Sequence, residues 1–368
     1  MNNIKKKMIV WGTAGKATTF FNSPYLYRGY KIVAFTDNNI NKEEFHGINI
    51  ININDIPLYN PDKIVICSSA HKEIEEQIKQ MEFCEFPEVI SYDDIMKLYK
   101  SQLKEKLRGN YSNSNDAEII HFINYYKDKE LGVYDDNIGS HTKDYVQYDD
   151  NNHPYILFFG KKMYYPDDYY FQSDNKGQYV PDILKEQGKN SPHLYLTGTH
   201  TIHDGDVIVD AGVCEGNFSL RYIDKVKRAY LIESDPRWVR ALKRTFAPYK
   251  EKVILCNKFL SRDTTSDTIS LDDLIPEENV NFIKMDIEGA EVDALLGAKR
   301  TLRRSNAKLS ICSYHKHSDY ENIKFILESL GYKTSSSRGY MCFIYDNNII
   351  EHGDLRRGIV YGSKDRKL

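Results

Sequence analysis

Short apolar runs alternate with polar and amphipathic segments over most of the chain. Near its start, the runs KMIVWG, KIVAFT and DKIVICSS each predict a strand, and KEIEEQIKQM has apolar residues at helical spacing over residues 72–81. Strands that alternate with helices indicate βαβ units and a parallel sheet. This pattern predicts a small Rossmann-like α/β domain over residues 1–98.

Residues 99–153 depart from this alternation. They contain a helix-like stretch, DAEIIHFINYYKDKEL, and then a run rich in Asp and Asn over residues 135–153. Polar runs without apolar periodicity are typical of loops. We therefore expect a helical connection followed by a polar loop.

A second alternating series fills residues 154–368. It opens with YILFFGKKMYYPDDYYF, in which two apolar runs around a Gly-Lys-Lys segment predict a β-hairpin over residues 154–172. The runs VIVDAG, AYLIESD, KVILCN, NFIKMD and KLSICSY then predict strands joined by helices, with a core at about residues 191–345. The predicted fold is α/β in both domains, and the larger domain has a mostly parallel sheet with helices on both faces.

One strand-to-helix turn in this second series has the features of a ligand-binding site. In DGDVIVDAGVCEGNFSLRYI, the first strand ends at Asp210, Gly212 follows, and residues 216–218 lead into a helix. The next strand ends at Glu233, 23 residues after Asp210, where an acidic residue can bind ribose hydroxyls. The turn is not G-x-G-x-x-G, which argues against NAD. The pattern D-x-G-x-x-x-G followed by E-x-D-P is typical of class I methyltransferases that use S-adenosylmethionine.

Several further motifs resemble one family. NFIKMDIEGAEVDALLGAKRTL (281–302) resembles the signature of the FkbM family of S-adenosylmethionine-dependent methyltransferases, and SLDDL, SYHKHSDY, SPHLYLTGTH and YLIESDPRWVRALKRTF also match its pattern in the expected order. Two features depart from it: Glu215 stands where many relatives have a small or amide residue, and the segment between Ser261 and Leu271 is short. The resemblance implies a class I methyltransferase fold with S-adenosylmethionine as the cofactor.

Strand-end positions give the expected cofactor contacts, because ligands of open α/β sheets lie beyond the carboxyl ends of the strands. Asp210 and Gly212 should lie near the methionine part, Glu233 should bind the ribose hydroxyls, and the loop 257–263 should flank the adenine. The full set of predicted cofactor-binding residues is Asp210, Gly212, Glu215, Gly216, Asn217, Phe218, Glu233, Ser234, Asp263 and Asp286.

The next two strands should supply the reacting groups. A hydroxyl acceptor must lose its proton as the methyl group is transferred, and His315 is the first candidate for the base, with Asp286 second. Lys284 could hold an anionic group of the acceptor. Glu288 should orient Lys284 or close the turn before a helix over residues 290–304. The predicted catalytic residues are therefore these four side chains.

The same residues also have simpler interpretations. Lys284, Asp286 and Glu288 fit a salt-bridged helix start, since charged strand ends are common without catalysis. His315 and His317 would share one face of an extended chain, and they fit surface histidines or, together with Asp286, metal ligands. Their H-K-H spacing is not diagnostic of a metal site, so no metal is predicted.

The first domain carries a weaker signal. Gly12 and Gly15 could cradle a phosphate, and Asp37 follows Gly12 by 25 residues, which is compatible with ribose binding. The glycine pattern is incomplete, which favours a structural or partner-binding role. Nucleotide-sugar binding stays open, because the domain resembles small Rossmann-like domains on some sugar-modifying enzymes.

Aromatic residues crowd the predicted hairpin. Aromatic faces with polar tips suit a sugar ring, but plain sheet packing explains the same composition. The residues concerned are Tyr155, Phe158, Phe159, Tyr164, Tyr165, Tyr169, Tyr170 and Phe171.

Composition narrows the function classes. Lys and Arg total 50 against 53 Asp and Glu, a formal net charge of −3, which gives no basic footprint for nucleic acid. No apolar run approaches the roughly 18–20 residues that cross a bilayer, and the apolar stretch after the basic opening MNNIKKK is too short for a signal peptide. The six cysteines never form C-x-x-C and sit mostly in strand-like runs, which is typical of reduced, buried thiols in a cytoplasmic protein.

These observations predict a methyltransferase that uses S-adenosylmethionine and O-methylates a hydroxyl of a sugar or related intermediate in surface glycan or natural-product biosynthesis. Its acceptor would be a small molecule, a sugar nucleotide or a glycan, with no nucleic-acid partner, and a homo-oligomer is compatible with the sequence. The alternative is a non-catalytic nucleotide-sugar-binding or scaffold protein with a degenerate methyltransferase domain. A nicotinamide-dependent oxidoreductase lacks a Tyr/Lys or His catalytic set in the first domain.

Overall fold

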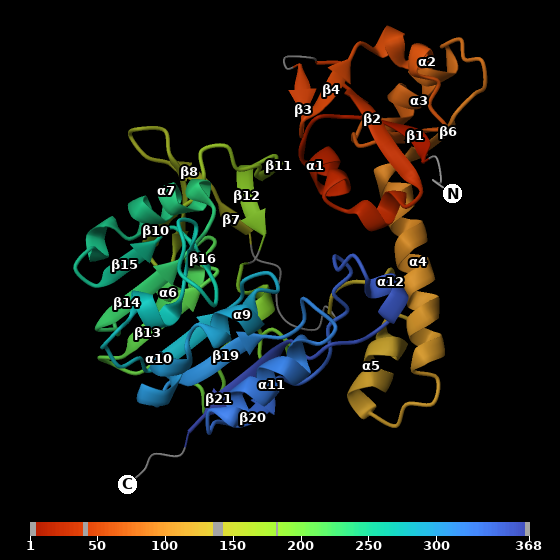
Figure 1. Ribbon diagram of the computed structural model, residues 1–368. Coiled ribbons are helices and arrows are strands. Elements are labelled where there is room, and N and C mark those ends of the chain that lie inside the picture. Colours follow the sequence, from red (N-terminus) through yellow and green to blue (C-terminus); the bar gives the residue numbers. More distant parts are fainter. Residues whose placement is uncertain (1–4, 40–42, 135–142, 182, 365–368) are drawn as a thin grey trace. The chain divides into compact units, whose positions relative to one another are not determined.

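The computed structural model describes residues 5–39, 43–134, 143–181 and 183–364 (Figure 1). The chain divides into two compact units. Unit 1 comprises Met1–Asn113, Tyr126–Leu131 and Ile344–Gly353, and unit 2 comprises Ser114–Tyr125, Gly132–Phe343 and Asp354–Leu368. The predicted boundaries after residues 98 and 153 stay predictions, and the first part of the predicted polar loop, residues 135–142, lies outside the described residues.

Unit 1 is a Rossmann-like α/β unit built on a six-stranded sheet of order β3-β4-β2-β1-β5-β6. All neighbours pair in parallel except the edge strand β3. The strands are β1 (Lys6–Trp11), β2 (Tyr30–Thr36), β3 (Glu44–Phe45), β4 (Ile48–Ile51), β5 (Lys63–Ile66) and β6 (Glu88–Ser91). The helices are α1 (Gly15–Phe21), α2 (Ile56–Tyr59), α3 (His71–Lys79), α4 (Tyr92–Asn110) and α12 (Ile349–His352), with short 3₁₀ turns η1 (Pro24–Tyr27) and η2 (Ile53–Asp55).

Unit 2 contains a seven-stranded sheet of order β15-β14-β13-β18-β19-β21-β20. The first five strands pair in parallel, and β21 runs antiparallel to both of its neighbours. This is the Rossmann order 3-2-1-4-5 with a reversed strand beside it. The strands are β13 (Val207–Ala211), β14 (Arg228–Ile232), β15 (Val253–Cys256), β18 (Phe282–Met285), β19 (Lys308–Cys312), β20 (Lys333–Ser336) and β21 (Ile359–Ser363). The predicted α/β fold with a mostly parallel sheet is confirmed.

The helices after β13 connect the strands of the large sheet and cover it (Figure 1). They are α6 (Asn217–Tyr222), α7 (Pro236–Thr245), α8 (Leu271–Leu274), α9 (Glu291–Leu296), α10 (Lys299–Arg304) and α11 (Asp319–Ser329), with the 3₁₀ turn η4 (Ala247–Tyr249). Unit 2 also contains α5 (Ala117–Tyr125) and the 3₁₀ turn η3 (Lys185–Gln187), which precede the sheet in the sequence. The single helix predicted over residues 290–304 is wrong, because the chain forms α9 and α10 with a break at Gly297. The main chain of Ser261 and Arg262 packs against that glycine so closely that a Cβ atom there would lie 2.3 Å from the Ser261 carbonyl oxygen.

Short antiparallel strands precede the large sheet. They form the sheets β10-β9-β8 and β11-β12-β7, while β16 and β17 form a small parallel pair. Strands β9 and β10 make the hairpin expected from the sequence, although it ends at Tyr164. The strands are β7 (Lys143–Tyr145), β8 (Gln147–Tyr148), β9 (Pro154–Phe158), β10 (Lys161–Tyr164), β11 (Gln172–Asp174), β12 (Gly177–Pro181), β16 (Phe259–Leu260) and β17 (Thr268–Ile269).

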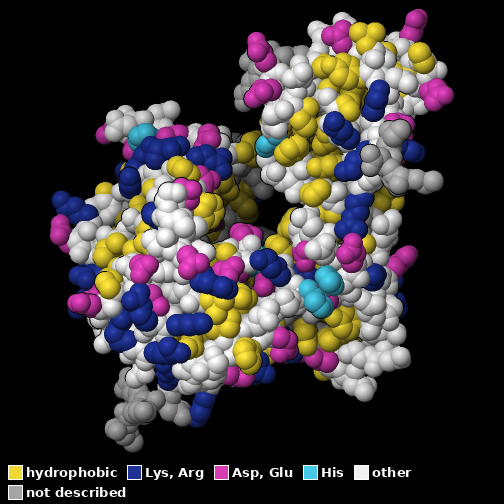
Figure 2. Space-filling model, viewed as in Figure 1, with side chains coloured by type: hydrophobic (Ala, Val, Ile, Leu, Met, Phe, Trp, Pro, Cys, Tyr) yellow, Lys and Arg dark blue, Asp and Glu magenta, His cyan; other side chains and the backbone are white. Residues whose placement is uncertain are grey.

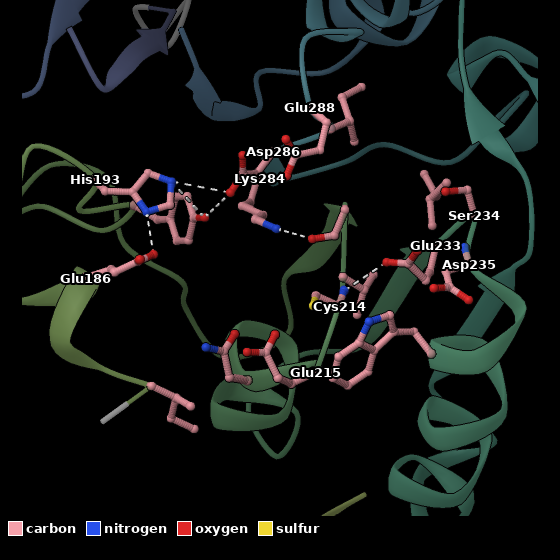
Figure 3. Close-up of a pocket in the computed structure, with 18 of the residues that line it drawn as sticks. Glu186, His193, Cys214, Glu215, Glu233, Ser234, Asp235, Lys284, Asp286 and Glu288 are labelled. Carbon is pink, nitrogen blue, oxygen red and sulfur yellow. Dashed lines mark hydrogen bonds and ion pairs between the residues drawn. The ribbon is translucent and has the colours of Figure 1, made fainter. Parts of the chain in front are cut away.

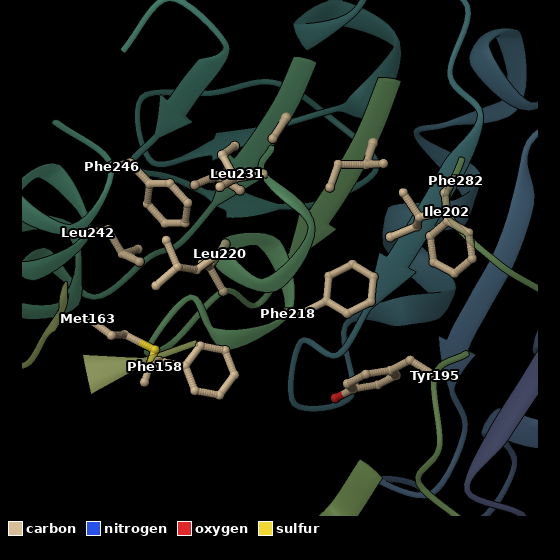
Figure 4. Packing of buried hydrophobic residues seen from close by; sticks show 14 of the residues in the cluster. Phe158, Met163, Tyr195, Ile202, Phe218, Leu220, Leu231, Leu242, Phe246 and Phe282 are labelled. Carbon is tan, nitrogen blue, oxygen red and sulfur yellow. The ribbon is translucent and has the colours of Figure 1, made fainter. Parts of the chain in front are cut away.

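The core of unit 2 lies on both faces of its large sheet. Along β13, Val207, Val209 and Ala211 join one apolar cluster, and Ile208 joins the other. A strand buried on both faces reads as a continuous apolar run, as β13 does. Figure 4 shows part of the second cluster, in which Phe218 of α6 packs near Phe282 of β18. The sheet is therefore a rigid support for the loops at its carboxyl edge.

Two predictions from composition can be compared with the structure. All six cysteines are free, but only Cys67, Cys312 and Cys342 are buried, so burial was overestimated for the exposed Cys84 and Cys214. Within the described residues, no helix combines the length and apolar character needed to cross a bilayer. Basic and acidic side chains are interspersed on the face that Figure 2 shows, in keeping with the near-neutral sequence.

Candidate active site

A cavity of about 900 Å³ opens at the carboxyl edge of the large sheet in unit 2. Residues that follow β13, β14, β15, β18 and β19 line it (Figure 3). The strand order reverses between β13 and β18, and open α/β sheets bind ligands in the crevice at that switch point. The size is also typical of a small-molecule site.

The turn after β13 requires its glycines. Gly212 and Gly216 both have positive φ angles, +76° and +84°. A Cβ atom on Gly212 would lie 1.7 Å from the carbonyl oxygen of Asp286, and one on Gly216 would lie 2.8 Å from the side chain of Leu242. The turn therefore packs directly against the end of β18 and against α7, which fixes its backbone along the cavity.

Glu233, the residue after β14, presents its carboxylate to the cavity beside this turn. Its Oε2 atom accepts the N–H of Cys214 at 2.9 Å, and Oε1 accepts the N–H of Asp235 at 2.8 Å. Each carboxylate oxygen can accept a second hydrogen bond. Asn257 donates to the carbonyl oxygens of Glu233 and Ser234, which holds this loop in place.

Asp210 and Lys284 form a buried ion pair under the cavity. Lys284 Nζ lies 3.1 Å from Asp210 Oδ1 and donates to the carbonyl oxygen of Gly212 at 2.5 Å, while Ser219 donates to Asp210 Oδ2. Burial opposes the charge of Lys284, but the carboxylates of Asp210 and Asp286 outweigh it and raise the lysine pKa. Lys284 thus supports the glycine turn. The expectation that Glu288 orients Lys284 is wrong, because the lysine is paired with Asp210.

Asp286 is the centre of a polar network at the other end of the cavity. Its Oδ2 atom accepts the hydroxyl of Tyr195 at 2.7 Å, its Oδ1 atom accepts the hydroxyl of Tyr314 at 3.1 Å, and His193 Nε2 lies 3.3 Å from Oδ2. Burial would raise the pKa of Asp286, but hydrogen bonding to His193 and the nearby positive charges of His193, Lys284 and His315 lower it well below its usual range. Asp286 is therefore an oriented, ionised carboxylate on the cavity wall.

His193 joins Asp286 to a second carboxylate. Its Nδ1 atom lies 3.1 Å from Glu186 Oε2, and the side chain is only 5% exposed. Burial lowers its pKa, but the two carboxylates outweigh this effect and raise the pKa to about 9. At neutral pH the ring is therefore a cation that bridges Glu186 and Asp286 (Figure 3).

His315 lies behind Asp286 and does not line the cavity. Its Nε2 atom is 3.5 Å from Asp286 Oδ1 and its Nδ1 atom is 3.1 Å from Glu291 Oε1. Burial lowers the pKa of His315, but these carboxylates outweigh burial and raise it. His317 turns outward to Asp354, at 2.8 Å. The expectation that both histidines share one face is wrong, because the chain bends directly after β19.

The cavity wall contains most of the residues predicted from the sequence. Those that line it are Gly212, Glu215, Asn217, Glu233, Ser234, Lys284, Asp286 and Glu288. Those that lie outside its lining are Asp210, Gly216, Phe218, Asp263 and His315. Asp263 is exposed in the turn between β16 and β17, where Lys258, Phe259 and Leu260 face the cavity instead. The functional roles of these side chains stay predictions.

Sequence reasoning missed His193, Tyr195 and Glu186. His193 and Tyr195 lie in the quoted motif SPHLYLTGTH, which was the available signal, but their partner Asp286 is far away in the sequence. The chain around them has no strand or helix periodicity. Only tertiary contact shows that these side chains meet.

An aromatic group forms another wall of the cavity. The rings of Tyr165 and Tyr169 each lie 5.6 Å from that of Trp238, and Glu215 lines the cavity with them. The Tyr165 hydroxyl is buried without a hydrogen-bond partner among the described residues. Of the aromatic residues predicted on the hairpin, Tyr165 and Tyr169 alone line this cavity, so the sugar-platform and packing interpretations both stay open.

At the phosphate site predicted in unit 1, the described residues form a tightly packed turn stabilised by hydrogen bonds. Gly12 has φ +127°, and a Cβ atom there would lie 2.8 Å from the carbonyl oxygen of Cys67. Asp37 accepts the N–H and the hydroxyl of Thr13 at 2.9 and 2.8 Å. The Asp37 carboxylate therefore stabilises the turn, and both the structural or partner-binding role of this unit and ligand binding by it stay predictions.

Comparison with known proteins finds family models that match two parts of the chain. Residues 165–334 match the methyltransferase FkbM domain, and residues 4–86 match the C2185-like N-terminal domain. None of the curated proteins matches the chain.

Several solved structures show distant similarity. The methyltransferase FkbM from Methylobacillus flagellatus is 16% identical over 97% of this chain and 90% of its own, with a TM-score of 0.43. The putative methyltransferase SMU.1697c from Streptococcus mutans, solved in complex with SAH, is 13% identical over 45% of this chain and 91% of its own, with a TM-score of 0.32. On the match to the family model, residues 165–334 of this chain form a methyltransferase domain of the FkbM family.

Proposed function

We propose that this protein transfers a methyl group from S-adenosylmethionine to a hydroxyl of a sugar or a related intermediate of surface glycan or natural-product biosynthesis. The main support for the proposal is the cavity at the switch point of the sheet. The carboxylate of Glu233, which can accept further hydrogen bonds, lies at one end, and the polar network around Asp286 lies at the other. The FkbM domain supports methyl transfer as the reaction type.

The residues at the Glu233 end fit the cofactor. Both oxygens of Glu233 keep a lone pair for the two ribose hydroxyls, and Gly212 of the glycine turn lines the cavity beside them. Lys258, Phe259 and Leu260 line the adjoining wall, where the adenine is expected. S-adenosylmethionine bound there would supply an activated methyl group for the acceptor oxygen, and the proton of the acceptor hydroxyl would pass to water in the cavity.

Asp286 is the side chain best placed to hold the acceptor. Tyr195, Tyr314 and His193 fix its carboxylate without covering it, since Asp286 still lines the cavity. It can accept the hydrogen bond of an incoming hydroxyl and keep the oxygen in line for transfer, which is the larger part of catalysis for an activated donor. His315 acts through Asp286 in this arrangement, because its ring lies behind the carboxylate.

The wall near Asp286 suits a hydroxylated acceptor. Glu186, Gln187 and Glu288 offer hydrogen-bonding groups, and Tyr134 adds an aromatic ring with a polar tip. The carboxylates and the amide can bind the hydroxyls of a sugar, and the tyrosine ring can pack against the apolar face of the sugar ring. The acceptor class rests on this chemistry and on the family.

Two measurements test the proposal. Calorimetry with S-adenosylhomocysteine should show binding to the full chain, and a methyl-transfer assay over a panel of sugar nucleotides and glycans should identify an acceptor. With that acceptor, Asp286→Asn should lower turnover by about 10²–10⁴-fold and leave the affinity for S-adenosylhomocysteine nearly unchanged. Glu277→Gln, at an exposed position after α8, is the matched control.

The results separate the enzyme from the scaffold alternative. A folded chain that binds no S-adenosylhomocysteine would refute the methyltransferase proposal and favour a degenerate domain. Full turnover in Asp286→Asn would remove Asp286 from the acceptor site while leaving the reaction type intact.

A further inference from the structure

Three acidic side chains surround the buried ring of His315. Asp286 Oδ1 lies 3.5 Å from Nε2, Glu288 Oε2 lies 3.6 Å from Nε2, and Glu291 Oε1 lies 3.1 Å from Nδ1. Among the described residues, none of the three carboxylates pairs with a lysine or arginine: Lys284 is paired with Asp210. The cluster therefore concentrates negative charge around one imidazole.

Part of this cluster lacks hydrogen-bond partners. Asp286 Oδ1 accepts the hydroxyl of Tyr314, and Glu291 Oε1 accepts a main-chain N–H, but other polar atoms of the cluster have no partner. His315 is only 3% exposed at its side chain, yet neither ring nitrogen has a hydrogen-bond partner of acceptable geometry within the described part of the chain. Glu291 is fully buried, and its Oε2 atom has no hydrogen-bond partner there either. Buried polar atoms nearly always have hydrogen-bond partners. An imidazole and a carboxylate oxygen that lie side by side without such partners therefore indicate a ligand.

We propose that Asp286, Glu291 and His315 hold a divalent metal cation, with Glu288 able to join them from the cavity side. The three residues can each offer one ligand atom such that all lie within 4.8 Å of one another. Ligands bound at about 2.0–2.2 Å from one ion lie roughly 3–4 Å apart, so small side-chain rotations complete the site. Two carboxylates and an imidazole suit a divalent ion such as Mn²⁺.

A neighbouring cluster is the weaker candidate. His193, Asp286 and Cys312 also approach one another closely enough to share an ion. However, both nitrogens of His193 are already engaged, Nδ1 with Glu186 and Nε2 with the hydroxyl of Tyr195. A metal there would have to displace a hydrogen bond of the His193 ring, whereas the His315 ring has no hydrogen bond of acceptable geometry to lose.

The position of the cation gives it a part in the proposed reaction, and this part of the inference rests on the proposed function. Asp286 and Glu288 line the cavity, so an ion held by these two carboxylates and by His315 would lie at the boundary between the cavity wall and the buried ring. A bound divalent ion lowers the pKa of a coordinated hydroxyl. The acceptor O–H bond then breaks before or during transfer, its proton passes to water in the open cavity, and the cation stabilises the alkoxide oxygen.

Binding of Mn²⁺ alone tests the site without turnover. The full chain, without an affinity tag and dialysed against a chelator, is titrated with Mn²⁺ while electron paramagnetic resonance follows the free ion. The wild type should bind about one Mn²⁺ per chain, and Glu291→Gln and His315→Gln should each weaken binding by about 10–100-fold or more. His317→Gln and Glu277→Gln, which change an exposed histidine and an exposed carboxylate, should bind as the wild type does.

A second measurement does not depend on variants that fold. Pulsed electron paramagnetic resonance of Mn²⁺ on the wild type should detect nitrogen coupling from a coordinated imidazole, and this coupling should change in a chain labelled with ¹⁵N-histidine. Absence of nitrogen coupling, or unchanged Mn²⁺ affinity in a folded His315→Gln variant, would overturn the inference.

Parallel titration with S-adenosylhomocysteine separates the two proposals. A wild type that binds S-adenosylhomocysteine but neither Mn²⁺ nor Mg²⁺ overturns the cation site and leaves the proposed function standing. A wild type that binds Mn²⁺ through His315 but no S-adenosylhomocysteine supports the site and refutes the proposed function.

Discussion

Replacing Glu233 by glutamine tests the proposed ribose site with little disturbance of the fold. The side chain keeps its length, and the remaining oxygen can still accept the N–H of Cys214 or Asp235. The new NH₂ group, however, faces the other main-chain N–H, and two donors cannot bond to each other. Glu233→Gln therefore removes one accepting oxygen from the cavity and leaves the loop after β14 almost complete.

The magnitude follows from the lost acceptor. A hydrogen bond to a charged group contributes about 1.5–3 kcal/mol, and glutamine loses at least one such bond to a ribose hydroxyl. That loss corresponds to about a 10- to 150-fold rise in Kd. Glu233→Ala would lose both bonds and also both loop contacts, so its effect on affinity would be larger but mixed with a change in loop stability.

Calorimetry with S-adenosylhomocysteine on the full chain is the assay. Thermal unfolding of the same samples shows whether the variant is folded, and Glu277→Gln controls for the loss of one negative charge. A folded Glu233→Gln variant with wild-type affinity would refute the assignment of this carboxylate to the ribose.

Further predictions concern stability. Gly212→Ala should lower Tm sharply and abolish S-adenosylhomocysteine binding, because a Cβ atom there would lie 1.7 Å from a main-chain oxygen. The control Gly198→Ala, at a position with open space around it, should leave Tm and binding unchanged. A stable Gly212→Ala variant would contradict the packing described. Lys284→Met should lower the free energy of unfolding by about 3–5 kcal/mol, because it leaves Asp210 buried without its partner. Adding Asp210→Asn should recover part of this loss, and simple additivity of the two effects in the double variant would argue against the ion pair. Because the pKa of His193 rises from 6.5 to about 9 on folding, its stabilisation of about 3 kcal/mol should be complete below pH 6.5 and disappear as the pH rises to about 9. Unfolding in the presence of a chelator should show this decline in the wild type, and the same decline in His193→Gln would rule out His193 as its source.

The geometry of the proposed cofactor end could be predicted from the sequence because it depends on local structure. A strand, a turn with positive φ and a helix follow one another within a few residues, so Gly212 is recognisable from its place in the sequence. Glu233 is one connection away, at the end of the neighbouring parallel strand. Asp263 lies outside the cavity lining, in the loop between the short strands β16 and β17, and two-residue strands leave no periodic signal in the sequence.

The acceptor end could not be predicted in this way because separate segments build it. The irregular segment that contains His193 and Tyr195 is held to the sheet by the hydroxyl of Ser310, which donates to the carbonyl oxygen of Tyr195 at 2.7 Å. Nothing in the local pattern shows that this contact brings the two side chains to Asp286. The family motif marked the segment, but only the tertiary structure assigns its side chains a partner.

His315 shows how one backbone assumption changes a mechanism. The sequence suggested an extended chain after β19, which would point His315 at the acceptor. Only residues 313–318 separate β19 from α11, and Asp319 accepts the N–H of Lys316 at 2.8 Å, so the chain turns at once. The turn packs the ring of His315 against Tyr314, with centroids 4.1 Å apart, and directs His317 outward. A histidine that was expected to meet the substrate therefore meets three carboxylates instead. To act as a base, His315 would need an open path from its ring nitrogen to the acceptor. To act as a metal ligand or as a positioning residue, it needs only its contact with Asp286. His315→Gln distinguishes these roles, because loss of turnover with loss of Mn²⁺ affinity identifies a ligand, and loss of turnover alone identifies a residue that positions Asp286.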